Sequence, residues 1–264
     1  MKSKITKKFE ELREKKEKAL ITYVTSGDPD LATTVDLVLT MEKAGADIVE
    51  LGIPYSDPLA DGPVIQRGAK RALEGGADID SIFTMVKDLR KKTDIPLVFL
   101  LYYNSIFKHG IKSFLDKCKD TGIDGLIIPD LPLEERRELN EMMKDYPIDL
   151  IPLVAPTSED RIEKILLDGD GFIYCISSKG VTGKRDHFEV DLKNFINKVK
   201  KYTDKPLAIG FGISDGEAIK NLKSLADGLI VGSAIVEKIE EGMKEGQIKE
   251  KVFDFVNELH KAIE

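Results

Sequence analysis

Two carboxylates in one short segment are the residues best suited to chemistry. Glu50 interrupts the apolar run Ile48–Leu51, and Asp61 follows eleven residues later, after a loop that contains Pro54 and Pro58. Burying an ionised carboxylate without a partner costs on the order of several kcal/mol, so a Glu in an apolar strand has either a function or a structural partner such as a Lys. Two carboxylates that face one pocket could divide acid and base work.

Three glycine-bearing turns form a second group with chemical potential. They are Gly180–Gly183, Gly210–Ser214 and the pair Gly232 and Ser233. Glycine lets a backbone N–H approach an anion closely, and Ser233 opens a helical pattern whose dipole favours negative charge. One such turn alone indicates little, because Gly ends many strands, but together they predict a phosphate site. The polar segment Ser177–Glu189 is expected to be a mobile lid, the alternative being a surface insertion.

The elements that must position these residues are short apolar runs alternating with longer amphipathic segments. The runs lack polar alternation, as is typical of parallel strands buried on both faces. Dividing 264 residues among eight such units gives about 33 each, close to the roughly 250-residue size of a TIM barrel. We therefore predict one α/β domain over residues 1–264, a (β/α)8 TIM barrel. Its expected strands are Leu20–Val24, Ile48–Leu51, Leu97–Leu101, Gly125–Ile128, Ile148–Leu153, Phe172–Ile176, Leu207–Gly210 and Gly228–Val231.

Helical patterns lie between the strands. An extra N-terminal helix, Lys7–Lys18, is expected to close the bottom of the barrel, and the apolar spacing predicts helices at Thr33–Lys43 and Ile82–Leu89. An open doubly wound sheet is the alternative fold, but its G-x-G-x-x-G fingerprint does not follow the first strand. Helix starts are expected at Ser81, Ser158 and Ser214, and glycine-bearing helix ends at Ala44–Asp47 and Thr121–Asp124.

Charge and composition exclude several function classes. The chain has 40 Lys and Arg against 47 Asp and Glu, a net charge of −7, and the two signs are interleaved, so we expect no nucleic-acid partner. No apolar run approaches the roughly 20 residues that span a bilayer. The charged N-terminal segment lacks the apolar core of a secretion signal, which predicts a cytoplasmic protein.

Cysteine and histidine usage gives no indication of a metal site. The two cysteines, Cys118 and Cys175, are expected to be buried small apolar residues and not a disulfide or a metal knuckle. His109, His187 and His260 are far apart in the sequence and show no ligand spacing.

The segment VELGIPYSDPLADG, Val49–Gly62, resembles the signature of the tryptophan synthase α subunit family, residue for residue over fourteen positions. The similarity extends from Lys18 to the C-terminal helix. It implies a lyase of tryptophan biosynthesis that splits indole-3-glycerol phosphate into indole and glyceraldehyde 3-phosphate by a retro-aldol reaction. It also implies that no cofactor is needed, and that the partner is a pyridoxal-phosphate-dependent β subunit in an α2β2 complex.

The resemblance assigns roles to individual residues. It implies that Glu50 is the acid–base group at the carbons being separated and that Asp61 hydrogen-bonds the indole N–H. It implies that Tyr174 supports the carboxylates, although Tyr174 could also be an ordinary core aromatic. The implied phosphate-binding residues are Gly183, Gly212, Gly232 and Ser233, and the implied walls of the indole pocket are Tyr23, Leu100 and Ile128.

Other functions stay open at this point. A stand-alone indole-3-glycerol-phosphate lyase would use the same residues, and a weakly active regulatory partner of the β subunit would share the fold. A different phosphate-binding barrel, such as a ring-closing synthase, would be expected to carry a catalytic Lys at a strand end, and no strand here supplies one. The apolar setting of Glu50 is expected to raise its pKa toward neutrality.

Overall fold

The strands of the protein form one parallel sheet. The computed structural model describes residues 2–167, 169–176, 185–210 and 212–264. Within them the sheet has nine strands in the order β5-β4-β3-β2-β1-β9-β8-β7-β6, and every pair is parallel. The strands are β1 (Ala19–Thr25), β2 (Ile48–Gly52), β3 (Leu97–Leu100), β4 (Gly125–Ile127), β5 (Asp149–Leu150), β6 (Leu153–Val154), β7 (Ile173–Ile176), β8 (Leu207–Gly210) and β9 (Gly228–Val231).

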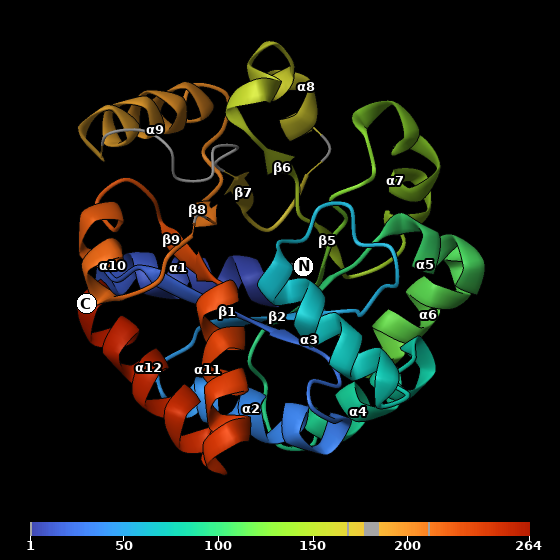
Figure 1. Cartoon of the computed structure of the whole chain (residues 1–264). Coiled ribbons are helices and arrows are strands. Elements are labelled where there is room, and N and C mark those ends of the chain that lie inside the picture. The colour runs from blue at the N-terminus through green and yellow to red at the C-terminus, as the bar shows by residue number, and fades with distance from the viewer. Residues whose placement is uncertain (1, 168, 177–184, 211) are drawn as a thin grey trace.

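The two outer strands of this order belong to one interrupted segment. Only Ile151 and Pro152 separate β5 from β6. The Ile151 N–H donates to Leu126 O on one side at 2.9 Å, and Pro152 O accepts from Tyr174 N–H on the other side at 2.9 Å. Because Pro152 has no N–H of its own, the ladder is interrupted there. The chain therefore joins the two edges, which closes the (β/α)8 barrel (Figure 1), and the predicted fold class is confirmed.

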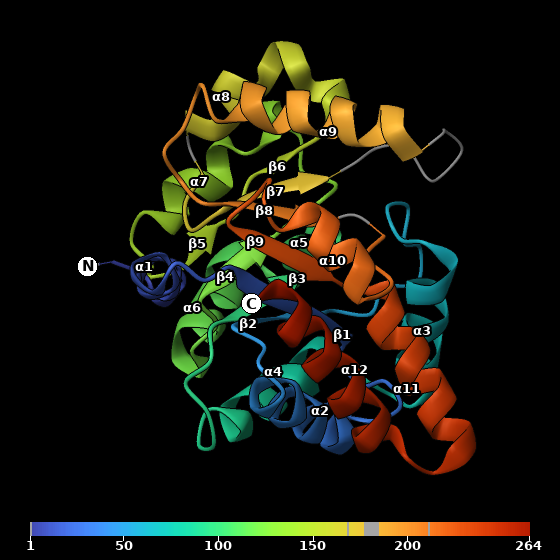
Figure 2. The same ribbon diagram turned by 90° about the vertical axis from the view of Figure 1, so that its left-hand side faces the viewer.

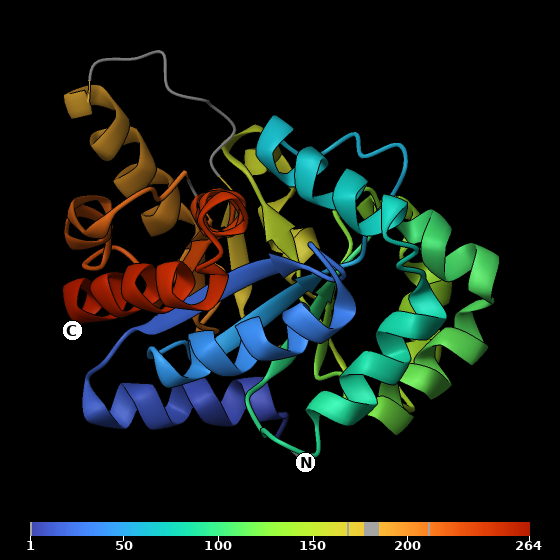
Figure 3. The same ribbon diagram turned by 60° about the horizontal axis from the view of Figure 1, so that its bottom comes forward.

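Helices surround the ring of strands on the outside (Figures 1 and 3). A large apolar layer lies between the strands and these helices, and a smaller one fills the barrel. Parallel strands carry apolar residues on both faces for this reason. The helices are α1 (Lys4–Lys15), α2 (Leu31–Lys43), α3 (Pro63–Glu74), α4 (Ile79–Leu89), α5 (Tyr103–His109), α6 (Ile111–Thr121), α7 (Arg137–Met143), α8 (Ile162–Leu167), α9 (Arg185–Val199), α10 (Gly216–Leu222), α11 (Ser233–Glu245) and α12 (Ile248–Ile263), with 3-10 turns η1 (Leu133–Glu135) and η2 (Pro156–Arg161).

Helix α1 closes the end of the barrel where the strands begin. Its buried residues Phe9 and Leu12 belong to the interior layer, and the rings of Phe9 and Phe172 lie 5.6 Å apart. The helix starts and ends three residues earlier than predicted, because Ser3 caps it and Lys16 takes a left-handed conformation with φ 60°. Figure 2 shows α1 at one end of the barrel and the loop that precedes α3 at the other.

Helix caps differ from several predictions by a few residues. Asp78, not Ser81, caps α4, and Ser81 is the third residue of that helix, where it completes a capping box with Asp78. Asp215, not Ser214, caps α10. Ser158 lies in the 3-10 turn η2 and not directly before a helix. The left-handed end of α6 at Gly122, with φ 82°, is as predicted.

Membrane and metal-binding features are absent from the part of the chain that the structure describes. None of its helices is long and apolar enough to cross a bilayer. No group of three or more His, Cys, Asp or Glu side chains in these ranges could hold a metal ion. Cys118 and Cys175 are both buried and free, as expected.

Candidate active site

A cavity of about 410 Å³ opens where the barrel strands end. The carboxyl ends of parallel strands meet at one edge, and in barrels this edge carries the active site. Eight of the predicted site residues line this one cavity although they come from seven separate stretches of the chain. These are Tyr23, Glu50, Asp61, Leu100, Tyr174, Gly212, Gly232 and Ser233.

Glu50 lies deep in the cavity, in the middle of β2. Its register partner on β1 is Tyr23, so both side chains face the barrel interior. The residue is 1% exposed, and its Oε1 atom has no hydrogen-bond partner among the described residues. Burial disfavours the charged form, which raises the pKa of Glu50 to about 8. The carboxyl group is therefore mainly protonated at neutral pH and can both give and take a proton near that pH.

Asp61 lies at the mouth of the cavity, two residues before α3. Partial burial raises the pKa of its carboxyl group, and an interaction with the Tyr102 hydroxyl opposes that rise. The same hydroxyl accepts a hydrogen bond from the Ala60 N–H at 2.9 Å. The ring of Tyr102 stacks on Tyr55 at 5.0 Å, and Asn104 donates to the Tyr55 hydroxyl at 2.8 Å. The end of β3 therefore holds the loop that carries Asp61.

Tyr102 was missed by the sequence analysis. It follows the predicted strand Leu97–Leu101 directly, and a polar-tipped aromatic at a strand end could have indicated it. Burial raises the pKa of Tyr102 to about 12, so its hydroxyl stays protonated near neutral pH.

Two further glycines make room for the tyrosines of the cavity. A Cβ atom at Gly52 would lie 2.1 Å from the Tyr23 hydroxyl, and one at Gly210 would lie 2.4 Å from the Tyr174 ring. Only glycine leaves space for the rings at these strand ends. Burial raises the pKa of both tyrosines above the usual range, so both stay neutral. The Tyr23 hydroxyl lies 3.2 Å from Thr25 Oγ1.

The opposite side of the cavity is suited to an anion. Gly232 caps α11 without a side-chain hydrogen bond, and Ser233 and Ala234, in the first turn of that helix, line the cavity. The first N–H groups of a helix have no acceptor within it, and its dipole favours negative charge there. Gly212, with φ +37°, lines the same region. Gly212, Gly232 and Ser233 thus line one cavity, and its phosphate-binding role stays a prediction.

Two predicted parts of the site require separate comment. Gly183 and most of the expected lid Ser177–Glu189 lie outside the described residues, and the last part of that segment belongs to α9, which starts at Arg185. Ile128 does not line the cavity: it is 2% exposed and belongs to the outer apolar layer. Its neighbour Ile127 belongs to the interior layer, so alternation along the chain turns Ile128 outward, and Pro129 lines the cavity in its place.

Comparison with known proteins gives one consistent result. The sequence profile of a family described as tryptophan synthase alpha chain matches residues 9–264. The tryptophan synthase alpha chain of Alkaliphilus metalliredigens is 62% identical over 98% of this chain and 97% of its own length. That of a Thermoanaerobacter species is 54% identical over 99% and 100%.

Solved structures agree with the sequence comparison. Tryptophan synthase subunit alpha from Legionella pneumophila superposes with a TM-score of 0.93 at 32% identity, covering 100% of this chain and 99% of its own. A chain in tryptophan synthase from M. tuberculosis, in an open form, superposes with a TM-score of 0.89 at 28% identity, covering 100% and 99%.

Proposed function

Because this chain belongs to the tryptophan synthase alpha chain family, we propose that Glu50 and Asp61 carry out its reaction in the cavity described above. The reaction is that of a carbon–carbon lyase: indole-3-glycerol phosphate is cleaved to indole and glyceraldehyde 3-phosphate in tryptophan biosynthesis. The observation that carries the residue assignment is the buried Glu50 carboxyl, which lies without a hydrogen-bond partner among the described residues, in the same cavity as Asp61.

The proton movements follow from these two carboxyl groups. Indole is a poor leaving carbanion, so its C3 atom must be protonated before the carbon–carbon bond breaks. Glu50, protonated at neutral pH, donates that proton, and the resulting carboxylate takes the proton of the neighbouring glycerol hydroxyl. The hydroxyl carbon becomes the aldehyde, and the electrons of the broken bond restore the indole ring. Asp61, accepting a hydrogen bond from the ring N–H, stabilises the cation formed in between.

The rest of the cavity fixes the substrate at both ends. We propose that Gly212, Gly232 and Ser233 bind the phosphate group, with Gly183 as a further predicted contact. Tyr23 and Leu100 line the space beside Glu50 and form walls for the flat indole ring. Tyr174 stays neutral and supports the carboxyl groups. Such fixation converts binding energy into correct orientation of the reacting atoms.

Cofactor use follows from the same chemistry. The steps above move only protons and electron pairs within the substrate, with no net oxidation or reduction, so we propose that the chain needs no metal or organic cofactor of its own.

Membership in this family implies a β subunit as partner. We propose that the complex is α2β2, that its pyridoxal phosphate lies in the β subunit, and that indole passes there. Two exposed apolar side chains, each in a segment that follows the end of a barrel strand, support a partner on this face. Leu59, in the loop before α3, is 93% exposed, and Phe107, in the helix after β3, is 68% exposed. We also propose a single domain over 1–264 and a cytoplasmic location.

Single-turnover cleavage of indole-3-glycerol phosphate tests the residue assignment. Glu50→Gln and Asp61→Asn keep shape but remove proton exchange and charge, so each should bind substrate and lower the cleavage rate by roughly 10²-fold or more. Asp47→Asn is the control, because Asp47 precedes β2 at the other end of the barrel and accepts from the Leu20 N–H at 2.9 Å. A near-normal rate for either site variant removes that residue from the mechanism.

Titration with a β subunit tests the partnership. The isolated chain should cleave the substrate slowly, and saturating β subunit should raise turnover. The reason is that a partner which orders the loop carrying Asp61 would complete the site. Unchanged turnover would favour the stand-alone lyase, and activation of the β subunit without cleavage would favour the regulatory alternative.

A further inference from the structure

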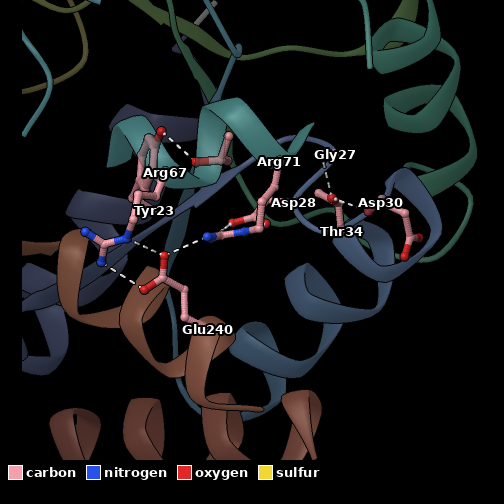
Figure 4. A network of polar contacts seen from close by, with 9 residues as sticks. Tyr23, Gly27, Asp28, Asp30, Thr34, Arg67, Arg71 and Glu240 are labelled. Atoms are coloured by element: carbon pink, nitrogen blue, oxygen red, sulfur yellow. Dashed lines mark hydrogen bonds and ion pairs between the residues drawn. The ribbon is translucent and has the colours of Figure 1, made fainter. Parts of the chain in front are cut away.

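A chain of ion pairs joins α3, α11 and the loop after β1 (Figure 4). Arg71 on α3 holds the Asp28 carboxylate through two hydrogen bonds, Nε to Oδ1 at 2.7 Å and Nη2 to Oδ2 at 2.8 Å. Its Nη1 atom donates to Glu240 on α11 at 2.6 Å. Arg67, one turn earlier on α3, donates to both Glu240 oxygens at 2.9 Å. One arginine therefore connects the loop after β1, α3 and α11.

The Arg67 side chain is 52% exposed, but the contacts of Arg71 with Asp28 and Glu240 are shielded from water, so they constrain the helices more than surface pairs would. The Asp28 side chain is fully buried, and the side chains of Arg71 and Glu240 are 23% and 17% exposed. Bidentate arginine–carboxylate contacts also fix relative orientation, which a single point charge does not. A Cβ atom at Gly68, between the two arginines, would lie 2.9 Å from Asp28 Oδ2, so the small residue there permits the close approach.

The two helices that are joined each present their first turn to the cavity. Asp61 directly precedes Gly62, the N-cap of α3, and Ile65 in its first turn lines the cavity. Ser233 starts α11 and lines the phosphate side. Arg71 and Glu240 lie about two turns further along their helices and do not belong to the cavity lining. The separation between the indole side and the phosphate side therefore depends on how α3 is held against α11.

We propose that Arg71 and Glu240 are positioning residues, which set the distance between the carboxylate that meets the indole N–H and the helix start that meets the phosphate. The inference rests on the proposed function, because it takes the substrate to be a ring and a phosphate joined by a three-carbon chain. A molecule that joins the ring and the phosphate binds more tightly than the separate ring and phosphate only if the spacing of the two subsites matches the length of the molecule. Each subsite alone is built from neighbouring residues and does not need the ion pairs between Arg71 and Glu240.

The test compares a joined ligand with its two fragments. The joined ligand is indole with a three-carbon phosphate ester chain at C3 that lacks the hydroxyl groups and cannot be cleaved. The fragments are indole and propyl phosphate. The protein contains no Trp, so fluorescence of the indole ring reports binding of the indole-containing ligands alone. Phosphorus NMR reports binding of propyl phosphate. The full-length protein is used throughout.

Glu240→Gln is the main variant, because it weakens the link between the helices and leaves Asp28 paired with Arg71. It should weaken binding of the joined ligand about tenfold while each fragment changes less than about twofold. Arg71→Lys, which keeps the charge but not the planar fork, should behave in the same way. Glu241→Gln is the matched control: its carboxylate pairs with Lys238 at 2.8 Å within α11 and should affect none of the three ligands.

A positioning role and a merely structural role give different results in this test. A merely structural role would lower the melting temperature and weaken the joined ligand and the fragments in parallel, which would overturn the proposal. Unchanged binding of all three ligands would overturn it as well. If the wild-type protein itself gains nothing from joining the fragments, it is the proposed substrate assignment that fails.

Discussion

The buried Glu50 carboxyl predicts an unusual pH dependence of stability. Because the folded protein holds the Glu50 proton more tightly than the unfolded chain does, stability falls as the pH rises from the ordinary pKa of 4.5 to about 8. Below that window the group is neutral in both states, and above it the folded state carries a buried charge. Glu50→Gln removes the titrating group while keeping its shape, so the variant should lack this decline.

The size of the effect follows from the pKa difference. A rise from 4.5 to about 8 is about 3.5 pKa units. At 1.36 kcal/mol per unit, this gives an upper bound of ~5 kcal/mol for the stability that the wild-type protein loses across the window. The slope within the window is ~1.4 kcal/mol per pH unit. Other titrating groups are common to both proteins, so their contributions cancel in the difference.

Urea unfolding of wild-type and Glu50→Gln protein between pH 5 and 9 measures this difference, with two spectroscopic probes to check that unfolding is two-state. The free energy of unfolding of the variant should rise relative to that of the wild type as the pH increases, and level off above about pH 8. Asp47→Asn serves as a control, since it leaves Glu50 in place. Parallel pH curves for wild type and Glu50→Gln would refute the assignment of a neutral, buried Glu50, and with it the acid role at neutral pH.

Three further changes test other parts of the cavity. Gly232→Asp has steric room, but its charge should weaken binding of phosphate by about tenfold or more, and unchanged affinity by calorimetry would move the phosphate site elsewhere. Gly210→Ala places a Cβ atom 2.4 Å from the Tyr174 ring, so it should cost about 1–3 kcal/mol of stability in urea unfolding and weaken binding of indole. Wild-type stability and affinity would show that the Tyr174 ring is free to move. Tyr102→Phe removes the acceptor of the Ala60 N–H and the interaction that lowers the pKa of Asp61. The acidic limb of the pH–rate profile should therefore shift to higher pH. An unshifted limb would contradict the interaction between Tyr102 and Asp61.

Much of the barrel could be predicted because apolar runs mark its strands directly. The same information does not tell which side of a strand faces inward when both sides are apolar, and this is why Ile128 was assigned to the cavity although Ile127 is the inward residue. Helix starts were uncertain by a few residues where several polar residues stand together, as with Ser214 and Asp215. The interruption at Pro152 follows from the missing N–H of proline but was not anticipated.

The candidate site also has parts that the sequence predicts and parts that it does not. Glu50 is predicted as a site residue because a carboxyl group in an apolar strand is conspicuous, and a phosphate site is predicted because glycine turns precede a helix start. Tyr102, directly after a strand, left only a weak signal, and the ion pairs of Asp28, Arg71 and Glu240 left none. Their contacts join residues far apart in the sequence, and an arginine on an amphipathic helix usually faces water.

Helix α1 constrains the order in which the barrel can be assembled. It precedes all nine strands in the chain, yet it contacts residues that come much later: Ser3 donates to Asp149 at 2.5 Å, and Phe9 lies against Phe172. Those residues leave the ribosome more than a hundred positions later, so the first helix must wait, with an apolar face uncovered, until the seventh strand β7 is available. A circular permutation that places α1 after β9 would shorten the time for which this apolar face is uncovered.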